Sequence, residues 1–265
     1  MDFSILIAVP TFNSMNLIPH LIHSLENQTF SNWKILFIDA STSQEECDFI
    51  EKICKNNKKC SYLKEFGKEK SIYNAMNIAF NYVNEKDWLM FWGADDLAFS
   101  NDVIERIYLQ ISKNLERSFF TDLIVFSGEY LSQNNQKVIR KVSFSNKNEI
   151  LDPNQFLKKL FFGFSLPHQA TVFSPKVRLK LKSYSTKLFL ASDLDYFLRL
   201  SKFKDLSVQS IPKCIVSMGD GGVSSKKHFL RFAEVMKSYI KFFGIFFLIP
   251  FFLRYFRRYL SLYSL

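Results

Sequence analysis

The hydrophobic pattern of the first hundred residues alternates between two kinds of segment. Continuous apolar runs at 5–9, 34–38 and 88–92 have the length of strands covered on both faces. Between them, apolar residues recur every three or four positions, as on one side of an amphipathic helix. These helical stretches are 19–25, 44–56 and 71–83, and a further short strand is expected at 61–64. The alternation predicts a parallel sheet with right-handed helical crossovers.

After residue 100 the alternation weakens, although helices and strands are still indicated. A helix is expected around 103–111, and Asp152-Pro153 opens a second that Gly163 should stop. Ser192 is suited to cap a third helix. Strands are expected at 122–127, 137–142 and 168–174. No repeat or linker separates the halves, so we expect one globule, with a nucleotide-binding half at 1–100 and an acceptor-binding half at 101–225.

The tail, residues 226–265, has a different composition. It carries four Lys and four Arg against Glu234, which is +7 of the net charge of +10. Twelve apolar residues at 242–253 are too few for a membrane span of about 20, and Pro250 should kink them. Aromatic residues beside basic ones predict an amphipathic segment in the interface of an anionic bilayer. The alternative is a C-terminal helix docked on the core or on a partner.

The bulk composition is that of a globular protein. The chain has 265 residues, of which 48% are hydrophobic and 23% charged. The four cysteines lack C-x-x-C spacing, which indicates reduced thiols in a cytosolic protein. The N-terminus carries Asp2 where a secretory signal would be basic, so we expect a first strand there instead.

Three carboxylates follow the predicted strands. Asp39 comes directly after the strand at 34–38, and Asp95-Asp96 follow the strand at 88–92. Ligands bind at the carboxyl ends of strands in such sheets, so these acids should share one edge. Two adjacent carboxylates repel each other, which favours a positively charged ligand beside them, although an isolated acidic pair is often only a surface turn.

Several motifs occur together and in order along residues 4 to about 225. They are "ILIAVPTFN", Asp39, "KSIYNAMN", "FWGADD", "PHQATVFS", "ASDLDYFLRL" and "GDGGVS". In this order the chain resembles family 2 glycosyltransferases, in particular bacterial members that build O-antigen, capsule or other surface polysaccharides. The resemblance implies an α/β GT-A fold, with a Rossmann-like, mostly parallel central sheet flanked by helices.

The resemblance also implies roles for residues of the nucleotide-binding half. Pro10, Thr11 and Asn13 would line the nucleotide pocket, and Asp39 would hold the base or ribose. Lys70 would meet a phosphate. Where relatives often carry Gly and Asp, this chain has Ser71 and Asn74, which makes nucleotide contacts at those two positions doubtful.

Further roles concern the metal, the base and the acceptor. Asp95 would lie near the ribose and Asp96 would bind Mg²⁺ or Mn²⁺, which prefer carboxylate oxygens. Asp193 matches the catalytic base, although Asp195 and a plain first-turn helix acid compete with that interpretation. His168 would lie near the diphosphate or the acceptor, or else be a structural histidine.

The implied activity is an inverting transfer from a nucleotide-sugar, with UDP expected, to a lipid-linked glycan. The enzyme would act as a peripheral protein on the inner face of the cytoplasmic membrane. Two alternatives are a non-catalytic family member serving as a scaffold and, from the pI of 9.3, a nucleic-acid-binding module. No nucleic-acid-binding motif is present, so we expect no nucleic acid among the partners.

Overall fold

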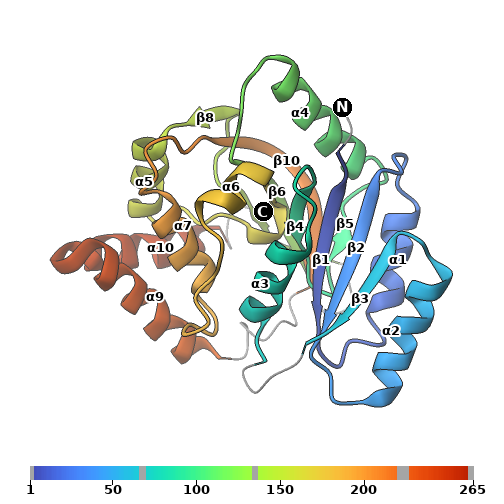
Figure 1. Cartoon of the computed structure of the whole chain (residues 1–265). Helices are drawn as coiled ribbons and strands as arrows, with labels where there is room; N and C mark the ends of the chain where they lie inside the picture. Colours follow the sequence, from blue (N-terminus) through green and yellow to red (C-terminus); the bar gives the residue numbers. More distant parts are fainter. Residues whose placement is uncertain (1–2, 66–69, 133–136, 220–226, 262–265) are drawn as a thin grey trace.

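The computed structural model describes residues 3–65, 70–132, 137–219 and 227–261. Its centre is a ten-stranded sheet in the order β3-β2-β1-β4-β9-β6-β10-β5, with β7 paired to β6 and β8 to β10 (Figure 1). The strands are β1 (Ile5–Thr11), β2 (Trp33–Asp39), β3 (Cys60–Lys64), β4 (Trp88–Phe91), β5 (Leu97–Ala98), β6 (Leu123–Leu131), β7 (Val138–Val142), β8 (Glu149–Leu151), β9 (Thr171–Phe173) and β10 (Val208–Gly219).

Helices cover both faces of this sheet. They are α1 (Ile18–Glu26), α2 (Gln44–Asn56), α3 (Ile72–Tyr82), α4 (Val103–Glu116), α5 (Pro153–Phe161), α6 (Pro175–Lys180), α7 (Ser192–Leu200), α9 (His228–Phe243) and α10 (Leu248–Leu260), with 3-10 turns η1 (His168–Ala170) and η2 (Gly244–Phe247). Alternate β1 residues face different cores. Ile5 and Ile7 pack with α1 and α4, and Leu6 and Ala8 pack with α3 and α7. The continuous apolar runs are therefore strands buried on both sides, as the sequence predicted.

The first four strands form the expected parallel unit. Ile7 of β1 lies opposite Ile35 of β2 and opposite Met90 of β4. The second half is mixed, because β9 runs antiparallel to both β4 and β6. This is the mostly parallel GT-A sheet that the resemblance implied, with one antiparallel strand at its centre.

Part of the second half differs from the sequence prediction. The strand expected at 168–174 begins as the turn η1, and only Thr171–Phe173 is strand. The strand β10, which the sequence pattern did not indicate, contains Pro212, a residue that normally argues against a central strand. Its pairing with β6 shifts between Ser210 and Cys214, so the proline lies in a bulge that needs no ladder hydrogen bond.

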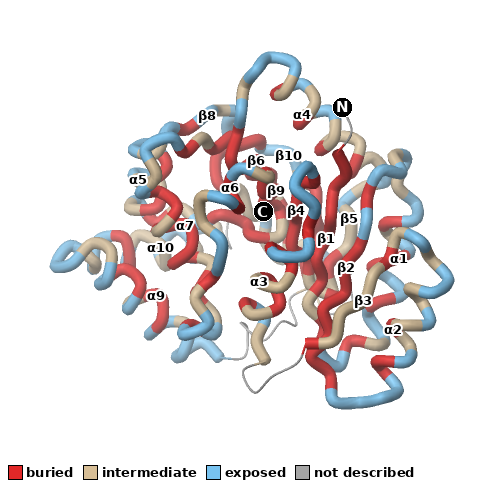
Figure 2. Tube along the Cα trace, in the orientation of Figure 1, coloured by how far each residue is buried: buried red, intermediate tan, exposed pale blue. Residues whose placement is uncertain are grey.

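The tail forms a helical hairpin of α9 and α10 at the lower left of Figure 1. The break falls at Gly244, where φ is +55°, and not at the expected Pro250, which lies in the first turn of α10. Proline is tolerated there because the first N–H groups of a helix have no intrahelical partner. One side of the hairpin packs on α5 and α7 and is buried, while its outer end is exposed (Figure 2).

Candidate active site

The acids predicted from the sequence lie at one edge of the sheet. The strand β1 separates β2 from β4, with Thr11 opposite Asp39 and Ala8 opposite Phe91. Asp39 is therefore at the carboxyl end of β2, and Asp96 lies five residues past the end of β4 on the same edge. This is the place where parallel α/β sheets bind their ligands.

Asp39 is fully buried and surrounded by donors. One carboxylate oxygen accepts from Thr11 Oγ1 (3.1 Å), Ser41 N–H (3.0 Å) and Ser41 Oγ (2.6 Å), and the other from Lys64 Nζ (2.9 Å). Burial alone raises the pKa of Asp39, but the bonds from Ser41 and Lys64 outweigh it and leave the pKa below its usual value. Asp39 is thus held ionised at the edge of the sheet.

The loop after β1 is fixed against the loop after β2. Asn13 has a φ of +51°, and its N–H donates to Ser41 Oγ at 3.0 Å. The N–H of Ser14 donates to Glu46 at 2.5 Å. Asparagine tolerates this left-handed conformation better than most residues. The bonds leave the Asn13 side chain exposed beside Asp39.

The two departures from the family pattern have local structural roles. The hydroxyl of Ser71 caps α3 by accepting from Asn74 N–H at 3.1 Å, and Asn74 Nδ2 donates to Glu65 at 2.5 Å. Lys70, just before this cap, donates to Ala40 O at 2.9 Å. The ammonium of Lys70 therefore lies next to the end of β2, although its bond is to the backbone.

Asp95 and Asp96 form an acidic pair in which Asp96 is buried and Asp95 half-buried. Asp96 is 2% exposed, and one of its oxygens accepts from Gly93 N–H at 2.5 Å. Burial, reinforced by the charge of Asp95, raises the pKa of Asp96 well above its usual range. Asp95 lies between two glycines, since a Cβ on Gly93 or Gly219 would come within 2.6 Å or 2.5 Å of its carboxylate oxygens.

The donor set of this pair suits a divalent cation that brings most of its own ligands. No salt bridge neutralises Asp95 or Asp96 within the ranges that the structure describes. Nor do those ranges contain a cluster of three or more His, Cys, Asp or Glu able to hold a metal. Mg²⁺ and Mn²⁺ are commonly held by one or two carboxylates together with phosphate oxygens and water, so these residues fit that group.

The two acids in the first turn of α7 differ in their partners. Asp195 is 4% exposed and bound by Arg199 (2.7 Å) and Lys241 (2.9 Å). Asp193 is partly exposed, and the Tyr73 hydroxyl is 3.5 Å from one of its oxygens. Of the two carboxylates, Asp193 is therefore the one with oxygens left to accept a proton.

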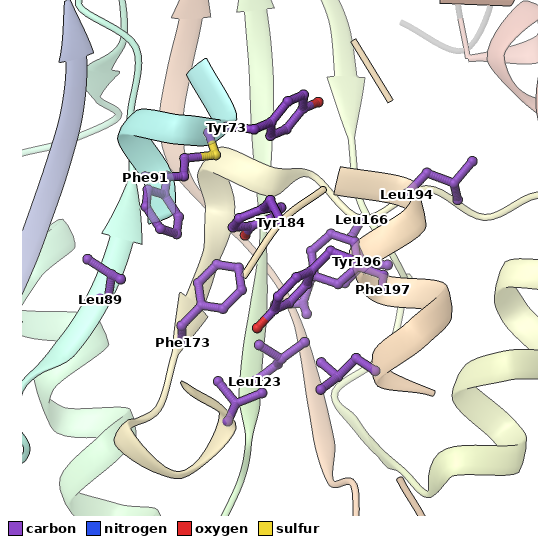
Figure 3. Packing of buried hydrophobic residues seen from close by; sticks show 14 of the residues in the cluster. Tyr73, Leu89, Phe91, Leu123, Leu166, Phe173, Tyr184, Leu194, Tyr196 and Phe197 are labelled. Atoms are coloured by element: carbon purple, nitrogen blue, oxygen red, sulfur yellow. The ribbon is translucent and has the colours of Figure 1, made fainter. Parts of the chain in front are cut away.

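His168 packs against an aromatic cluster that joins the halves and includes Phe91, Phe173 and Tyr184 (Figure 3). Its Nε2 is 2.8 Å from the Tyr184 hydroxyl, and its ring packs against Phe91, Phe173 and Phe197. Burial lowers the pKa of His168 to about 4, although the charge of Asp193 opposes the shift. This environment is that of a neutral structural histidine, and its contact with a diphosphate or acceptor stays a prediction.

The tail is bonded to the helix that carries Asp193. Glu234 of α9 accepts from the N–H groups of three successive residues that precede α7, at 2.8, 2.7 and 3.0 Å. These residues are Phe189, Leu190 and Ala191. Lys241, also on α9, reaches Asp195. Residues beyond 226 thus fix the start of α7, which composition alone did not indicate.

Two cavities are found elsewhere on the described surface. One, of about 500 Å³, lies between the starts of α1 and α2, and the other, of about 290 Å³, lies between α4 and β8. Neither is lined by Asp39, Asp96 or Asp193. The candidate site is therefore defined by its side chains and not by these cavities.

Comparison with known proteins decides the family. The family model described as glycosyl transferase family 2 matches residues 6–175, which include the strand-end acids at 39, 95 and 96. The chain belongs to glycosyltransferase family 2. It is accordingly a nucleotide-sugar-dependent glycosyltransferase, as the order of its motifs implied.

Relatives of this family 2 enzyme include bacterial glycosyltransferases, one of which has a diphosphoundecaprenol-linked acceptor in its name. It is 23% identical over 229 residues to the PGL/p-HBAD biosynthesis glycosyltransferase of Mycobacterium tuberculosis, covering 85% of this chain and 82% of the relative. It is 24% identical over 210 residues to the Escherichia coli UDP-Glc:alpha-D-GlcNAc-diphosphoundecaprenol beta-1,3-glucosyltransferase WfgD, covering 79% and 74%.

Solved structures share the fold at low identity. Staphylococcus aureus TarS in complex with UDP superposes with a TM-score of 0.64 at 16% identity, covering 89% of this chain and 65% of that one. A mannosyltransferase from Pyrobaculum calidifontis, solved with GDP-Man and Mn²⁺, gives 0.58 at 11% identity, covering 89% and 63%. The chain therefore spans slightly less than two thirds of these neighbours, and they support the GT-A fold.

Most of the candidate residues lie where the sequence placed them. Asp39, Asp95 and Asp96 share the sheet edge with Thr11 and its loop, as described above. The sequence interpretation missed Lys64 and Tyr73, the partners of the predicted acids. Tyr73 lies within the recognised "KSIYNAMN" motif and was a detectable signal, whereas Lys64 simply ends a strand.

Proposed function

We propose that this glycosyltransferase moves a sugar from a UDP-linked donor to a glycan carried on a membrane lipid, with inversion at the anomeric carbon. The observation that carries the proposal is the Asp95-Asp96 pair, buried at Asp96 and half-buried at Asp95, whose charges no described cation neutralises. A carboxylate pair is costly in such a place unless it serves a cationic ligand. Its position on the same edge as Asp39 matches a nucleotide diphosphate with its metal.

On the donor side, each group has a distinct task. Asp39, held ionised, accepts from the base or ribose, and the loop of Pro10, Thr11 and Asn13 covers the nucleotide. Asp95 would face the ribose, and Asp96 would hold Mg²⁺ or Mn²⁺. When bound, that metal supplies positive charge against the departing diphosphate. Lys70 lies at the same edge of the sheet and adds a positive charge near the phosphates.

On the acceptor side, Asp193 is the general base. It takes the proton of the acceptor hydroxyl while that oxygen bonds to the anomeric carbon and the bond to the diphosphate breaks. The Tyr73 hydroxyl orients the Asp193 carboxylate. A retaining route would require a carboxylate nucleophile beneath the sugar, and none of the candidate acids has that role.

The membrane lipid is proposed from the outer face of the tail hairpin. Exposed apolar residues recur every three or four positions along α10 at Leu248, Phe252, Phe256 and Tyr259, and Ile245 is 85% exposed at the tip. By length and composition alone, 228–260 could cross a membrane, but it is folded back at Gly244. An apolar stripe beside basic residues suits the interface of an anionic bilayer. The name of the relative WfgD, with its diphosphoundecaprenol acceptor, agrees with such a site.

The catalytic part is tested with Asp96→Asn and Asp193→Asn. We expect Asp96→Asn to lose metal-dependent UDP-sugar binding in a thermal-shift titration, because bound ligand raises the apparent stability. Asp193→Asn should keep that binding but lose sugar transfer by roughly a hundredfold or more. Undiminished turnover in either variant would remove its assigned role, and UDP-sugar binding without transfer by the wild type would favour a non-catalytic scaffold.

The membrane part is tested by changing the outer stripe and leaving the bonds to α7 intact. Phe252→Ser and Phe256→Ser, at side chains 64% and 58% exposed, should release the protein from anionic vesicles in sedimentation. Leu179→Ser, at 77% exposed on α6, is the matched control and should not. Equal sedimentation of all three variants would count against membrane binding through the hairpin.

A further inference from the structure

Four arginines from three elements meet where the hairpin reaches the sheet. They are Arg140 on β7, Arg231 on α9, and Arg254 and Arg258 on α10, and they are called the arginine cluster below. The two helices pack together at this point, because the ring of Phe232, next to Arg231, is centred 4.5 Å from Phe251 and 5.1 Å from Tyr255, next to Arg254. All four are partly buried. The cluster is therefore formed by the fold and is not a run of neighbouring surface charges.

The counter-charge described for the arginine cluster is Asp193, which acts on Arg254: burial lowers the pKa of Arg254, but Tyr239 and Asp193 raise it above its usual value. Several other arginines of the chain bond directly to acids or carbonyls, as Arg106 does to Asp102 and Arg257 to Phe162 O at 2.7 Å. No salt bridge to a carboxylate is found for the four cluster arginines among the described residues. Burial lowers the pKa of Arg258 to about 10, and the charges of the other three arginines add to this. Gathering like charges out of water is unfavourable unless an anion joins them.

The arginine cluster adjoins the active-site edge on its donor side. Arg140 lies opposite Tyr130 in the pairing of β7 with β6, and its guanidinium is 4.3 Å from the centre of the Tyr130 ring. Tyr130 in turn lies opposite Met218, next to Gly219. Gly219 is the glycine that packs against Asp95. Two strands, β6 and β10, therefore lie between Arg140 and the acidic pair.

The arginine cluster also adjoins the acceptor side. Arg254 interacts electrostatically with Asp193, the proposed base. The backbone at Arg254 packs closely against Gly163: a Cβ added to Gly163 would stand 2.4 Å from the backbone N of Arg254. Phe252 and Phe256, on the exposed stripe, are on the same helix. Helix α10 therefore combines positive charge that attracts an anion with an apolar surface for acyl or prenyl chains.

We propose that the arginine cluster binds the phosphate groups of a membrane lipid beside the acceptor site, an inference that rests on the function proposed above. Guanidinium groups hold phosphate oxygens with paired hydrogen bonds, and several of them suit a diphosphate. Two kinds of lipid carry this chemistry: the diphosphate carrier of a glycan, and an anionic phospholipid. In both, the phosphate would sit at the arginines while the apolar chains continue along the exposed stripe of α10.

The test compares Arg258→Gln with Arg257→Gln in the full chain. The two residues are adjacent on α10 and each change removes one positive charge, but Arg257 bonds to Phe162 O and stacks on Phe164 outside the cluster. Binding is measured by sedimentation with phosphatidylcholine vesicles that contain either undecaprenyl diphosphate or phosphatidylglycerol. We expect Arg258→Gln to weaken binding roughly tenfold or more in at least one arm, and Arg257→Gln about twofold or less.

The arms separate the source of the phosphate and the possible failures. Loss in the undecaprenyl diphosphate arm alone assigns the arginine cluster to the acceptor carrier, and loss in the phosphatidylglycerol arm assigns it to phospholipid. Equal weakening by both variants in both arms overturns the inference. UDP-sugar binding by thermal shift is measured in parallel. If the wild type lacks it, the proposed function fails, whereas intact UDP-sugar binding beside equal weakening refutes only the lipid site.

Stability provides a second readout. Because Arg258→Gln relieves like-charge repulsion, the free variant should melt at the same temperature as the wild type or higher. A structural role for Arg258 would instead lower the melting temperature. A destabilised variant with unchanged vesicle binding therefore also overturns the inference.

Discussion

The docking of the tail on the body can be tested at two glycines with positive φ. Gly163, just past α5, has a φ of +79°, and Gly244, at the break of the hairpin, has a φ of +55° and a ψ of −129°. Alanine at a positive φ costs about 1–2 kcal/mol, and up to about 3 kcal/mol where ψ lies outside the left-handed helical region, while the stiffer unfolded chain returns about 0.4–1 kcal/mol. From backbone conformation alone, Gly163→Ala should lose about 1 kcal/mol and Gly244→Ala about 1–2 kcal/mol.

The surroundings of the two glycines differ. A Cβ on Gly244 meets nothing within 4 Å, whereas one on Gly163 would stand 2.4 Å from Arg254 N and 2.5 Å from the carbonyl carbon of Leu253. These are backbone atoms of α10, so the helix must move away. That movement uncovers part of Phe251, which is 4% exposed, and fully burying a Phe side chain is worth about 1.5–3 kcal/mol. We therefore expect Gly163→Ala to lose about 3 kcal/mol in all.

Urea denaturation measures the two losses, and hydrogen exchange shows where they arise. Amides of 248–260 should exchange faster in Gly163→Ala and stay as in the wild type in Gly244→Ala. A loss of only about 1 kcal/mol in Gly163→Ala, with unchanged exchange in α10, would show that α10 does not pack against Gly163. The reasoning about the hairpin would then be wrong.

Three further changes test the site. Lys64→Met removes the half-buried partner of the buried Asp39 and should cost about 2–3 kcal/mol at pH 7 in urea denaturation. The pKa of Asp39 is lowered in the fold, so its contribution is present above its unfolded pKa of about 3.9 and lost as pH falls through the folded value; the cost should therefore shrink below about pH 4. A cost independent of pH would contradict the pairing. Gly219→Ala pushes its Cβ against the Asp95 carboxylate and should weaken UDP-sugar binding roughly tenfold by calorimetry while stability changes by about 1 kcal/mol or less, and unchanged affinity would refute the contact. His168, with a pKa of about 4, should show no ring-proton titration by NMR between pH 8 and 5, and a midpoint near 6.5 would contradict its burial.

The sequence predicted the first half of the fold well, because the patterns that specify its strands and helices lie within short segments of the chain. Continuous apolar runs separated by amphipathic helices leave few arrangements other than a parallel sheet, and acids directly after such strands must share its edge. The same logic placed Asp39 and Asp96 without coordinates. In the second half β10 escaped notice, since Pro212 interrupts its pattern and only the pairing with β6 reveals a bulge.

The partners of the site could not be read from the sequence for a different reason. Lys64 meets Asp39 across 25 positions, and Glu234 meets the start of α7 across more than 40. Such contacts are decided by tertiary packing, and a single sequence holds no signal of them. The tail illustrates both sides, because its basic and aromatic composition was evident while its break at Gly244 and its bonds to α7 were not.

The bonds of Glu234 bear on how new specificities can be built from enzymes of this kind. Suppose that everything after residue 226 is exchanged between two relatives. The recipient then has, in place of Glu234, a carboxylate positioned for the backbone of the other parent and not for its own Phe189 to Ala191. The C-terminal hairpin and α7 are better transplanted together, as one module. Chimeras joined before α7, so that α7 and the hairpin come from the same parent, should retain turnover that tail-only swaps lose.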